Sequence, residues 1–164
     1  MSTLHVILQG PVARVTLARP EVRNAFNADL IAELTAAFAQ IAAAPDVRAV
    51  VLAAEGPAFC AGADLRWMQA MAAFSWDENH ADAARLAEIF WVIDRCPVPV
   101  IARIQGDAYA GGVGLVACAD IAVSVDSASY CLSEARLGLL PGTIAPYVVR
   151  AMGERAARRY FTTA

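Results

Sequence analysis

Two glycine-containing loops are the first candidates for chemistry in this sequence of 164 residues. The segment 109–120 reads YAGGVGLVACAD, and the segment 56–64 reads GPAFCAGAD. Each follows an expected strand and places small residues directly before an expected helix. Amides at the N-terminus of a helix have no partner within it and lie at its positive end. Two such loops can aim one amide each at a shared oxygen, which is how an oxyanion hole is built.

The segment 109–120 allows two other interpretations when it is taken alone. Gly112, Gly114 and Ala117 spell G-x-G-x-x-A, and Glu134 follows near where the ribose-binding acid of a dinucleotide-binding fold would stand. About a hundred residues precede this motif, whereas the fingerprint usually belongs to the first βαβ unit. In the second interpretation, the glycines only allow a helix to pack closely on a strand.

Glu134 is the best candidate for an acid or base beside such a hole. It is a lone carboxylate in CLSEARLGLLPG, expected at the end of a strand, between the apolar pair Cys131-Leu132 and a turn. Partial burial there would raise its pKa toward the range of a general acid or base. A solvated charge at the end of a strand is the alternative.

The other polar residues offer less. His5 and His80 lie near no plausible nucleophile, which argues against a Ser-His-Asp arrangement, and their separation makes a poor metal site. Asp64 and Asp120 flank helix ends, where a cap or a surface charge is favoured. The cysteines lie in apolar runs without CxxC pairing and indicate small buried side chains in a reducing cytosol; they are Cys60, Cys96, Cys118 and Cys131.

Composition narrows the class of protein. Hydrophobic residues make up 59% of the chain and charged residues 18%, against roughly 45–50% and 25% in soluble domains. This excess predicts an oligomer interface or a piece missing from a larger fold. The final ERAARRYFTTA is helix-like and stops without a terminating Gly or Pro, so we expect truncation.

Charge and hydropathy argue against nucleic-acid and membrane partners. The net charge is −3, whereas nucleic-acid binding requires a basic patch. The one basic cluster is expected to be a solvated helix face; it comprises Arg150, Arg155, Arg158 and Arg159. No signal peptide is evident in MSTLHVILQG, and Asp120 interrupts the best apolar stretch. We therefore expect a cytoplasmic protein.

Strands and helices are expected to alternate, so the fold class is α/β in a single domain over residues 1–164. LHVILQ and VARVTLA form a hairpin at Gly10-Pro11. A loop over 19–27 ends in Asn27 as the N-cap of a helix over 28–44, and the buried strand VRAVVLAA follows.

The second half continues the alternation. An amphipathic stretch begins at Asp64, a polar break covers 75–79, and a long helix runs over 81–96. The strand PVPVIARI leads to the glycine-rich segment. After it come the strands IAVSV and ASYCL, a turn, and a final helical region.

Taken together, these segments resemble the enoyl-CoA hydratase/isomerase (crotonase) family over essentially the whole chain. The resemblance is carried by RPEVRNAFN, FCAGADL, YAGGVGLVACADIAVSV and SEARLGLLPG, in this order and spacing. It implies a spiral of ββα units, followed in the family by a C-terminal helical portion that assembles trimers and covers the site. By this resemblance, we expect the chain to lack that portion.

The resemblance also implies an acyl-CoA site. The family's two oxyanion amides fall on Ala63 and Gly111, which would hold the thioester oxygen as an enolate forms. Arg23 matches a basic position that contacts the CoA nucleotide. The adenine and pantetheine pocket matches Ala25, Ala61, Asp64 and Leu65.

The catalytic carboxylates depart from the family pattern. Hydratases of the family commonly use two glutamates; Glu134 occupies the second place, and the first falls on Gly114, beside the substrate but without a side chain. The pattern of the glycine-rich and SEARLGLLPG segments is similar to the methylglutaconyl-CoA and isohexenylglutaconyl-CoA hydratase type, which acts in leucine and acyclic-terpene breakdown.

The expected function is hydration of an enoyl-CoA in a homotrimer or hexamer, with coenzyme A present only as part of the substrate and no metal. Isomerisation and thioester hydrolysis are alternatives within the superfamily. A non-catalytic CoA-binding or assembly module is the alternative from another class.

Overall fold

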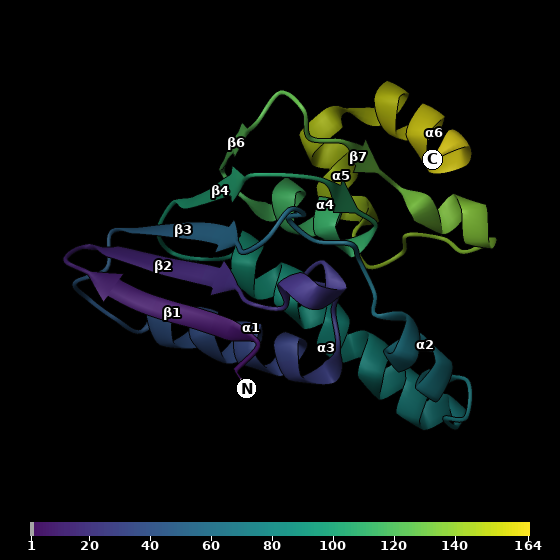
Figure 1. Ribbon diagram of the computed structural model, residues 1–164, viewed down its shortest axis with the longest axis horizontal. Coiled ribbons are helices and arrows are strands. Elements are labelled where there is room, and N and C mark those ends of the chain that lie inside the picture. The colour runs from purple at the N-terminus through teal and green to yellow at the C-terminus, as the bar shows by residue number, and fades with distance from the viewer. Residues whose placement is uncertain (1) are drawn as a thin grey trace.

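The opening hairpin begins a five-stranded sheet in the computed structural model, which describes residues 2–164. β1 (Leu4–Gln9) pairs antiparallel with β2 (Val12–Leu17) across the turn at Gly10, whose φ of +57° suits glycine. Each later strand of this sheet pairs in parallel with its predecessor, in the order β1-β2-β3-β4-β6 (Figure 1). The later strands are β3 (Ala49–Ala54), β4 (Val100–Ile104) and β6 (Ile121–Ser124).

Two long helices pack against one another beside this sheet (Figure 1). They are α1 (Ala28–Ala42) and α3 (Trp76–Asp94). Strand β2 shows the alternation that this packing requires, because Ala13, Val15 and Leu17 are buried and Arg14 between them is exposed. The predicted hairpin, helical spacing and α/β class are therefore confirmed.

The second half of the chain builds a smaller layer around the glycine-rich segment. β5 (Ala108–Tyr109) pairs in parallel with β7 (Tyr130–Cys131) in a two-stranded sheet. The helices of this layer are α4 (Gly111–Cys118), α5 (Ala145–Met152) and α6 (Glu154–Thr163). α4 and α5 pack together, and α3 reaches α4 from the first layer.

Three predicted helix boundaries were wrong, and one of them is the end of α3 (Trp76–Asp94), which lies two residues before the predicted residue 96. The polar segment 75–79 was expected to be a break before a helix over 81–96, but it begins α3. Ser75 and Glu78 form a reciprocal capping box, in which each side chain accepts a hydrogen bond from the other residue's amide. The first long helix ends at Ala42, two residues earlier than predicted. Asn27 caps its start as expected, through a 2.9 Å bond from the amide of Leu30.

The segment around Glu134 also differs from the prediction. The expected strand ASYCL contributes only the two residues of β7, and Glu134 lies in the 3-10 helix η2 (Ser133–Leu137) rather than at a strand end. Gly138 ends η2 with a φ of +69°, in the left-handed conformation. The strand propensity of the preceding residues gives no sign of this short helix or of its left-handed end.

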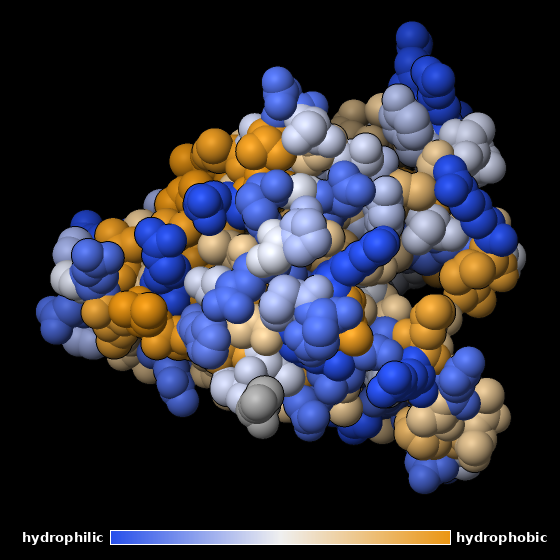
Figure 2. Space-filling view, viewed as in Figure 1, coloured by the Kyte–Doolittle hydropathy of each residue, from blue (hydrophilic) through white to orange (hydrophobic). Residues whose placement is uncertain are grey.

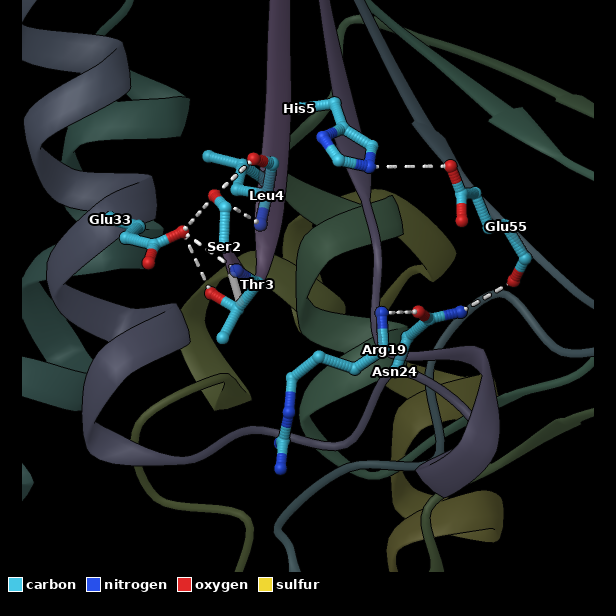
Figure 3. Close-up of polar contacts among 8 residues, drawn as sticks. All are labelled: Ser2, Thr3, Leu4, His5, Arg19, Asn24, Glu33 and Glu55. Carbon is cyan, nitrogen blue, oxygen red and sulfur yellow. Dashed lines mark hydrogen bonds and ion pairs between the residues drawn. The ribbon is translucent and has the colours of Figure 1, made fainter.

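The described N-terminal residues are fastened to α1 by one carboxylate. Glu33 Oε2 accepts hydrogen bonds from the hydroxyls of Ser2 and Thr3 and from the amide of Thr3 (Figure 3).

At the opposite edge of the sheet, every residue of β6 is exposed, including Ile121 and Val123. Figure 2 shows apolar surface gathered over this edge and near the β1–β2 turn.

Candidate active site

A cavity of about 450 Å³ lies between α2 (Leu65–Met71) and the segment that follows β7. The outline of the space-filling view is notched between these two parts (Figure 2). Five of the predicted site residues line it, from three segments far apart in the sequence. They are Ala61, Ala63, Leu65, Gly111 and Glu134. The fold therefore joins both glycine-containing loops and the lone glutamate at one cavity, as their sequence pattern predicted.

The amides of Ala63 and Gly111 are free to bind a ligand. Neither donates a hydrogen bond to any atom of residues 2–164, and both residues line the cavity. Gly111 is the first residue of α4, so its amide lies at the positive end of that helix.

Hydrogen bonds fix the backbone on both sides of these amides. Phe26 donates to the Gly62 carbonyl at 2.7 Å and accepts from the amide of Asp64 at 2.8 Å, which brackets Ala63. The amide of Tyr109 donates to the Cys60 carbonyl at 2.9 Å, which joins the two loops directly. The peptides that carry the free amides are thus held before a ligand arrives.

Two glycines are required for these loops to meet. A Cβ on Gly111 would lie 2.5 Å from the ring of Phe26, and a Cβ on Gly112 would lie 2.4 Å from the Cys60 carbonyl oxygen. Phe26 in turn packs edge to face on Phe90, with ring centroids 6.2 Å apart.

The dinucleotide interpretation of the segment 109–120 is not supported. The Cys60 carbonyl lies against Gly112, where a pyrophosphate would have to approach the backbone.

Glu134 has the environment of an acid–base group. Its Oε2 is buried and has no hydrogen-bond partner among residues 2–164. Burial raises the pKa of this carboxyl above its ordinary value, and a hydrogen bond from its own amide opposes that shift in part. A buried carboxylate oxygen without a partner is costly in a folded protein and usually marks a functional position.

Gly114 lies outside the lining of the cavity. It is buried on α4, where a Cβ would meet Ile144 Cγ2 at 2.3 Å and Phe90 Cε1 at 2.8 Å. The place that a second glutamate takes in the family pattern is therefore filled by packing in this chain.

Arg23 lines a neighbouring cavity of about 240 Å³. Ala61 and Tyr109 also line it, and because Ala61 belongs to both cavities the two are adjacent. The amide of Ala61 donates to the Arg23 carbonyl at 3.0 Å. The loop that carries Arg23 is therefore hydrogen-bonded to Ala61, the residue that lines both cavities.

Asn24 holds this loop in an unusual conformation. Arg23 and Asn24 have φ of +54° and +56°. The buried Asn24 side chain accepts from the amide of Arg19 at 2.9 Å and donates to the carbonyl of Glu55 at 2.8 Å (Figure 3). It also donates to the carbonyl of Ala58 at 2.9 Å. These bonds compensate for the left-handed backbone, which costs a non-glycine residue roughly 1–3 kcal/mol.

Asp64 is both a helix cap and half of an ion pair. Its Oδ1 accepts from the amide of Arg66 at 2.9 Å, and its Oδ2 lies 3.0 Å from Arg19 Nη2. Burial alone would raise the pKa of Asp64, but the Arg66 amide and the Arg19 guanidinium hold it below the ordinary value. Arg19 also donates to the carbonyl of the buried Ala25. This arginine therefore connects the loop that carries Arg23 and Ala25 to Asp64 at the start of α2.

The family model for "Enoyl-CoA hydratase/isomerase" matches residues 8–164. The chain belongs to the enoyl-CoA hydratase/isomerase (crotonase) family. An enoyl-CoA hydratase of Alternaria alternata is 38% identical over 164 residues, which cover 98% of this chain and 52% of that protein. A mitochondrial Delta(3,5)-Delta(2,4)-dienoyl-CoA isomerase of Mus musculus is 38% identical over 142 residues, covering 80% and 42%.

Solved structures of the crotonase family give the same result. A Legionella pneumophila protein named for the enoyl-CoA hydratase/isomerase (crotonase) family superposes with a TM-score of 0.96 at 44% identity. The match covers 100% of this chain and 63% of that one. The chain thus spans 42% to 63% of the length of these three relatives.

Several residues of this crotonase site were not predicted from the sequence. Arg19, Phe26 and Ile144 shape it through contacts between distant segments. Arg19 and Phe26 lie in the RPEVRNAFN loop with Arg23 and so carried a local signal, whereas Ile144 carried none. Within residues 2–164, no group of three or more His, Cys, Asp or Glu could hold a metal ion. Over the same range, no helix is both long and apolar enough to cross a bilayer.

Proposed function

We propose that the intact protein adds water across the α,β-double bond of an enoyl-CoA thioester. The observation that carries this proposal is the arrangement of Glu134: its buried, unpartnered oxygen belongs to a residue that lines the same cavity as the free amides of Ala63 and Gly111. An acid–base group beside two converging donors is what an enolate mechanism requires.

The reaction uses these groups in two steps. The amides of Ala63 and Gly111 bind the thioester oxygen. The Glu134 carboxylate takes a proton from a water molecule while the oxygen of that water attacks the β-carbon. The π electrons of the double bond move onto the thioester oxygen as an enolate. Glu134 then returns the proton to the α-carbon as the enolate collapses. One water is added on one face, and Glu134 is regenerated.

The coenzyme A part of the substrate extends from this cavity into the neighbouring one. Arg23 supplies the positive charge for its nucleotide phosphates, and Ala61 lies where the pantetheine passes between the cavities. Ala25, Asp64 and Leu65 complete the predicted CoA residues, with Gly114 beneath the reacting end. No further cofactor is needed in this scheme.

The acyl group is proposed to be branched and neutral; the methylglutaconyl group that the sequence resemblance suggests is also branched but carries a second carboxylate. The walls that would receive it are largely apolar, including Leu137, Leu139 and Leu140, which suits branched carbon chains. Of the described residues that line the cavity, the one ionisable side chain is Glu134.

Isomerisation is the second candidate, because a single carboxylate can remove and return a proton on a bound acyl chain. The similarity to the mouse dienoyl-CoA isomerase favours this alternative specifically. Thioester hydrolysis uses the same groups. Product masses distinguish them, since hydration adds one water and isomerisation adds none.

The protein is further proposed to be a cytoplasmic homotrimer or hexamer, with residues 1–164 as one spiral core domain. The exposed apolar residues of β6 support an assembly. Light scattering on the intact protein tests it, and a monomer would contradict it.

Substitution Glu134→Gln in the intact natural protein tests the catalytic proposal. Because general acid–base groups contribute roughly 10²–10⁴-fold, we expect kcat on a 2-enoyl-CoA to fall by that factor with CoA affinity retained. Glu154→Gln, on the exposed face of α6, is the matched control and should keep full activity. Near-wild-type turnover by Glu134→Gln would reject the assignment.

A further inference from the structure

The residues directly before the two free amides both have a positive φ. Gly62 precedes Ala63 with φ +86°, and Ala110 precedes Gly111 with φ +49° and ψ −120°. Glycine adopts positive φ freely, whereas alanine does so only at a cost. Alanine at position 110 is therefore held there by its surroundings.

These two residues also touch each other. A Cβ built on Gly62 would lie 2.8 Å from the Ala110 Cβ, 3.1 Å from the Tyr109 carbonyl oxygen and 3.6 Å from the amide nitrogen of Gly111. The Cα of Gly62 thus packs on the Ala110 methyl group, with the Gly111 amide beside the contact. The turns at Gly62 and Ala110 are therefore in contact directly before the residues that carry the two free amides, Ala63 and Gly111.

Hydrogen bonds hold each turn from behind. The Gly62 carbonyl accepts from Phe26 at 2.7 Å, and the amide of Ala110 donates to the Cys131 carbonyl at 2.8 Å. The Ala110 carbonyl accepts from Val113 at 2.9 Å, in the first turn of α4. Because hydrogen bonds hold the neighbouring peptides, the φ and ψ of each residue together set the direction of the following amide.

We propose that Gly62 and Ala110 are positioning residues that form a strained backbone clamp, in which each left-handed turn directs the next amide into the cavity and the contact between them sets the spacing of the pair. This inference rests on the proposed oxyanion-binding role of Ala63 and Gly111. It adds the reason why those amides converge without help from a ligand. A preorganised pair of donors requires no reorganisation when charge develops on the substrate oxygen.

The test uses Gly62→Ala, which places a methyl group against Ala110 and strains residue 62. Misplacing a catalytic group by about 1 Å costs roughly 10²-fold, so we expect kcat to fall toward that factor while affinity for coenzyme A alone is unchanged. Ala110→Gly, which removes the opposing methyl group, should lower kcat by a smaller factor, because the freed backbone samples other conformations. The double variant Gly62→Ala/Ala110→Gly should regain part of the activity lost by Gly62→Ala.

Gly10→Ala is the matched control for strain. Gly10 has φ +57° and no atom within 4 Å of a built Cβ, so the substitution strains a left-handed turn far from the cavity. It should lower thermal stability and leave kcat unchanged. Equal loss of kcat in Gly10→Ala would overturn the clamp.

Enolisation of bound acetoacetyl-CoA gives a readout that does not need hydration, because its enolate carries charge on the thioester oxygen and absorbs in the near ultraviolet. We expect the absorbance to fall in Gly62→Ala and to recover partly in the double variant. Full absorbance in Gly62→Ala, or no recovery in a folded double variant, would reject the clamp. A wild-type protein that forms the enolate but hydrates no enoyl-CoA would reject the proposed function alone.

Discussion

Ile144 fills the space in front of Gly114, so that a Cβ on Gly114 would lie 2.3 Å from Ile144 Cγ2 and 3.0 Å from its Cβ. Ile144 is almost fully buried, directly before α5, and Phe90 closes the other side. A contact of 2.3 Å with the γ2 methyl group of a buried, β-branched side chain cannot be relieved by rotating a flexible end. At the position where the family pattern has a second glutamate, this protein therefore has Gly114, and the side chains of Ile144 and Phe90 fill the space beside it.

Gly114→Ala should accordingly lower the free energy of unfolding by roughly 1–3 kcal/mol through overpacking, even though alanine has the better helix propensity. Urea unfolding measures the change. Gly142→Ala is the matched control, because a Cβ there meets nothing within 4 Å, and its stability should be nearly unchanged. Equal effects at the two positions would show that the contact with Ile144 is relaxed at little cost.

The raised pKa of Glu134 predicts opposite pH effects on activity and stability. As a base, Glu134 must be ionised, so the acidic limb of the kcat/KM profile should lie above the ordinary carboxyl value of 4.5. Stability runs the other way. Above pH 4.5 the unfolded chain loses this proton before the folded protein does, so stability falls as pH rises through the folded pKa.

Glu134→Gln separates the two effects. The variant carries no charge at position 134, so its stability should exceed that of the wild type at neutral pH, with the difference vanishing below pH 4.5. Thermal melts across this range, together with initial rates, measure both. A difference in melting temperature that does not depend on pH would contradict the buried-carboxyl assignment.

Local patterns explain how much of this molecule could be predicted. The hairpin, the helix after Asn27 and the convergence of 56–64 with 109–120 follow from hydrophobic period and turn chemistry, which act between near neighbours. The start of α3 was missed although Ser75 and Glu78 carry the S-x-x-E signature of a capping box, because the polar residues 75–79 were interpreted as a break. Ile144 could not be assigned a role, because its contact with Gly114 depends on how α5 packs on α4.

Asp64→Asn should destabilise the protein while leaving the cap of α2 in place, since asparagine is an equally good N-cap. The substitution leaves the largely buried Arg19 without its ionic partner, which should cost roughly 1–3 kcal/mol. The sign with pH follows from the lowered pKa of Asp64: its contribution is present above the ordinary value of 3.8 and is lost as pH falls through the folded pKa.

The effect of Asp64→Asn should therefore be largest at neutral pH and should shrink below pH 3.8. Glu154→Gln breaks an ion pair with Arg158 that is exposed on both sides, and such pairs contribute only about 0–1 kcal/mol. Denaturant unfolding of both variants at several pH values makes the comparison. Equal losses would show that the Arg19 pair is solvated in solution.

The composition of the cavity predicts which acyl groups the intact protein prefers. A second carboxylate, as in a methylglutaconyl group, would find no Lys or Arg among residues 2–164 that line the cavity and would lie near Glu134. Like charges in a partly buried site repel, so a neutral branched enoyl-CoA should have the higher kcat/KM. The ratio should rise with pH through the pKa of Glu134 as that group ionises. Competition between the two thioesters, followed by mass spectrometry, measures the ratio. Preference for the dicarboxylic acyl group would contradict this prediction.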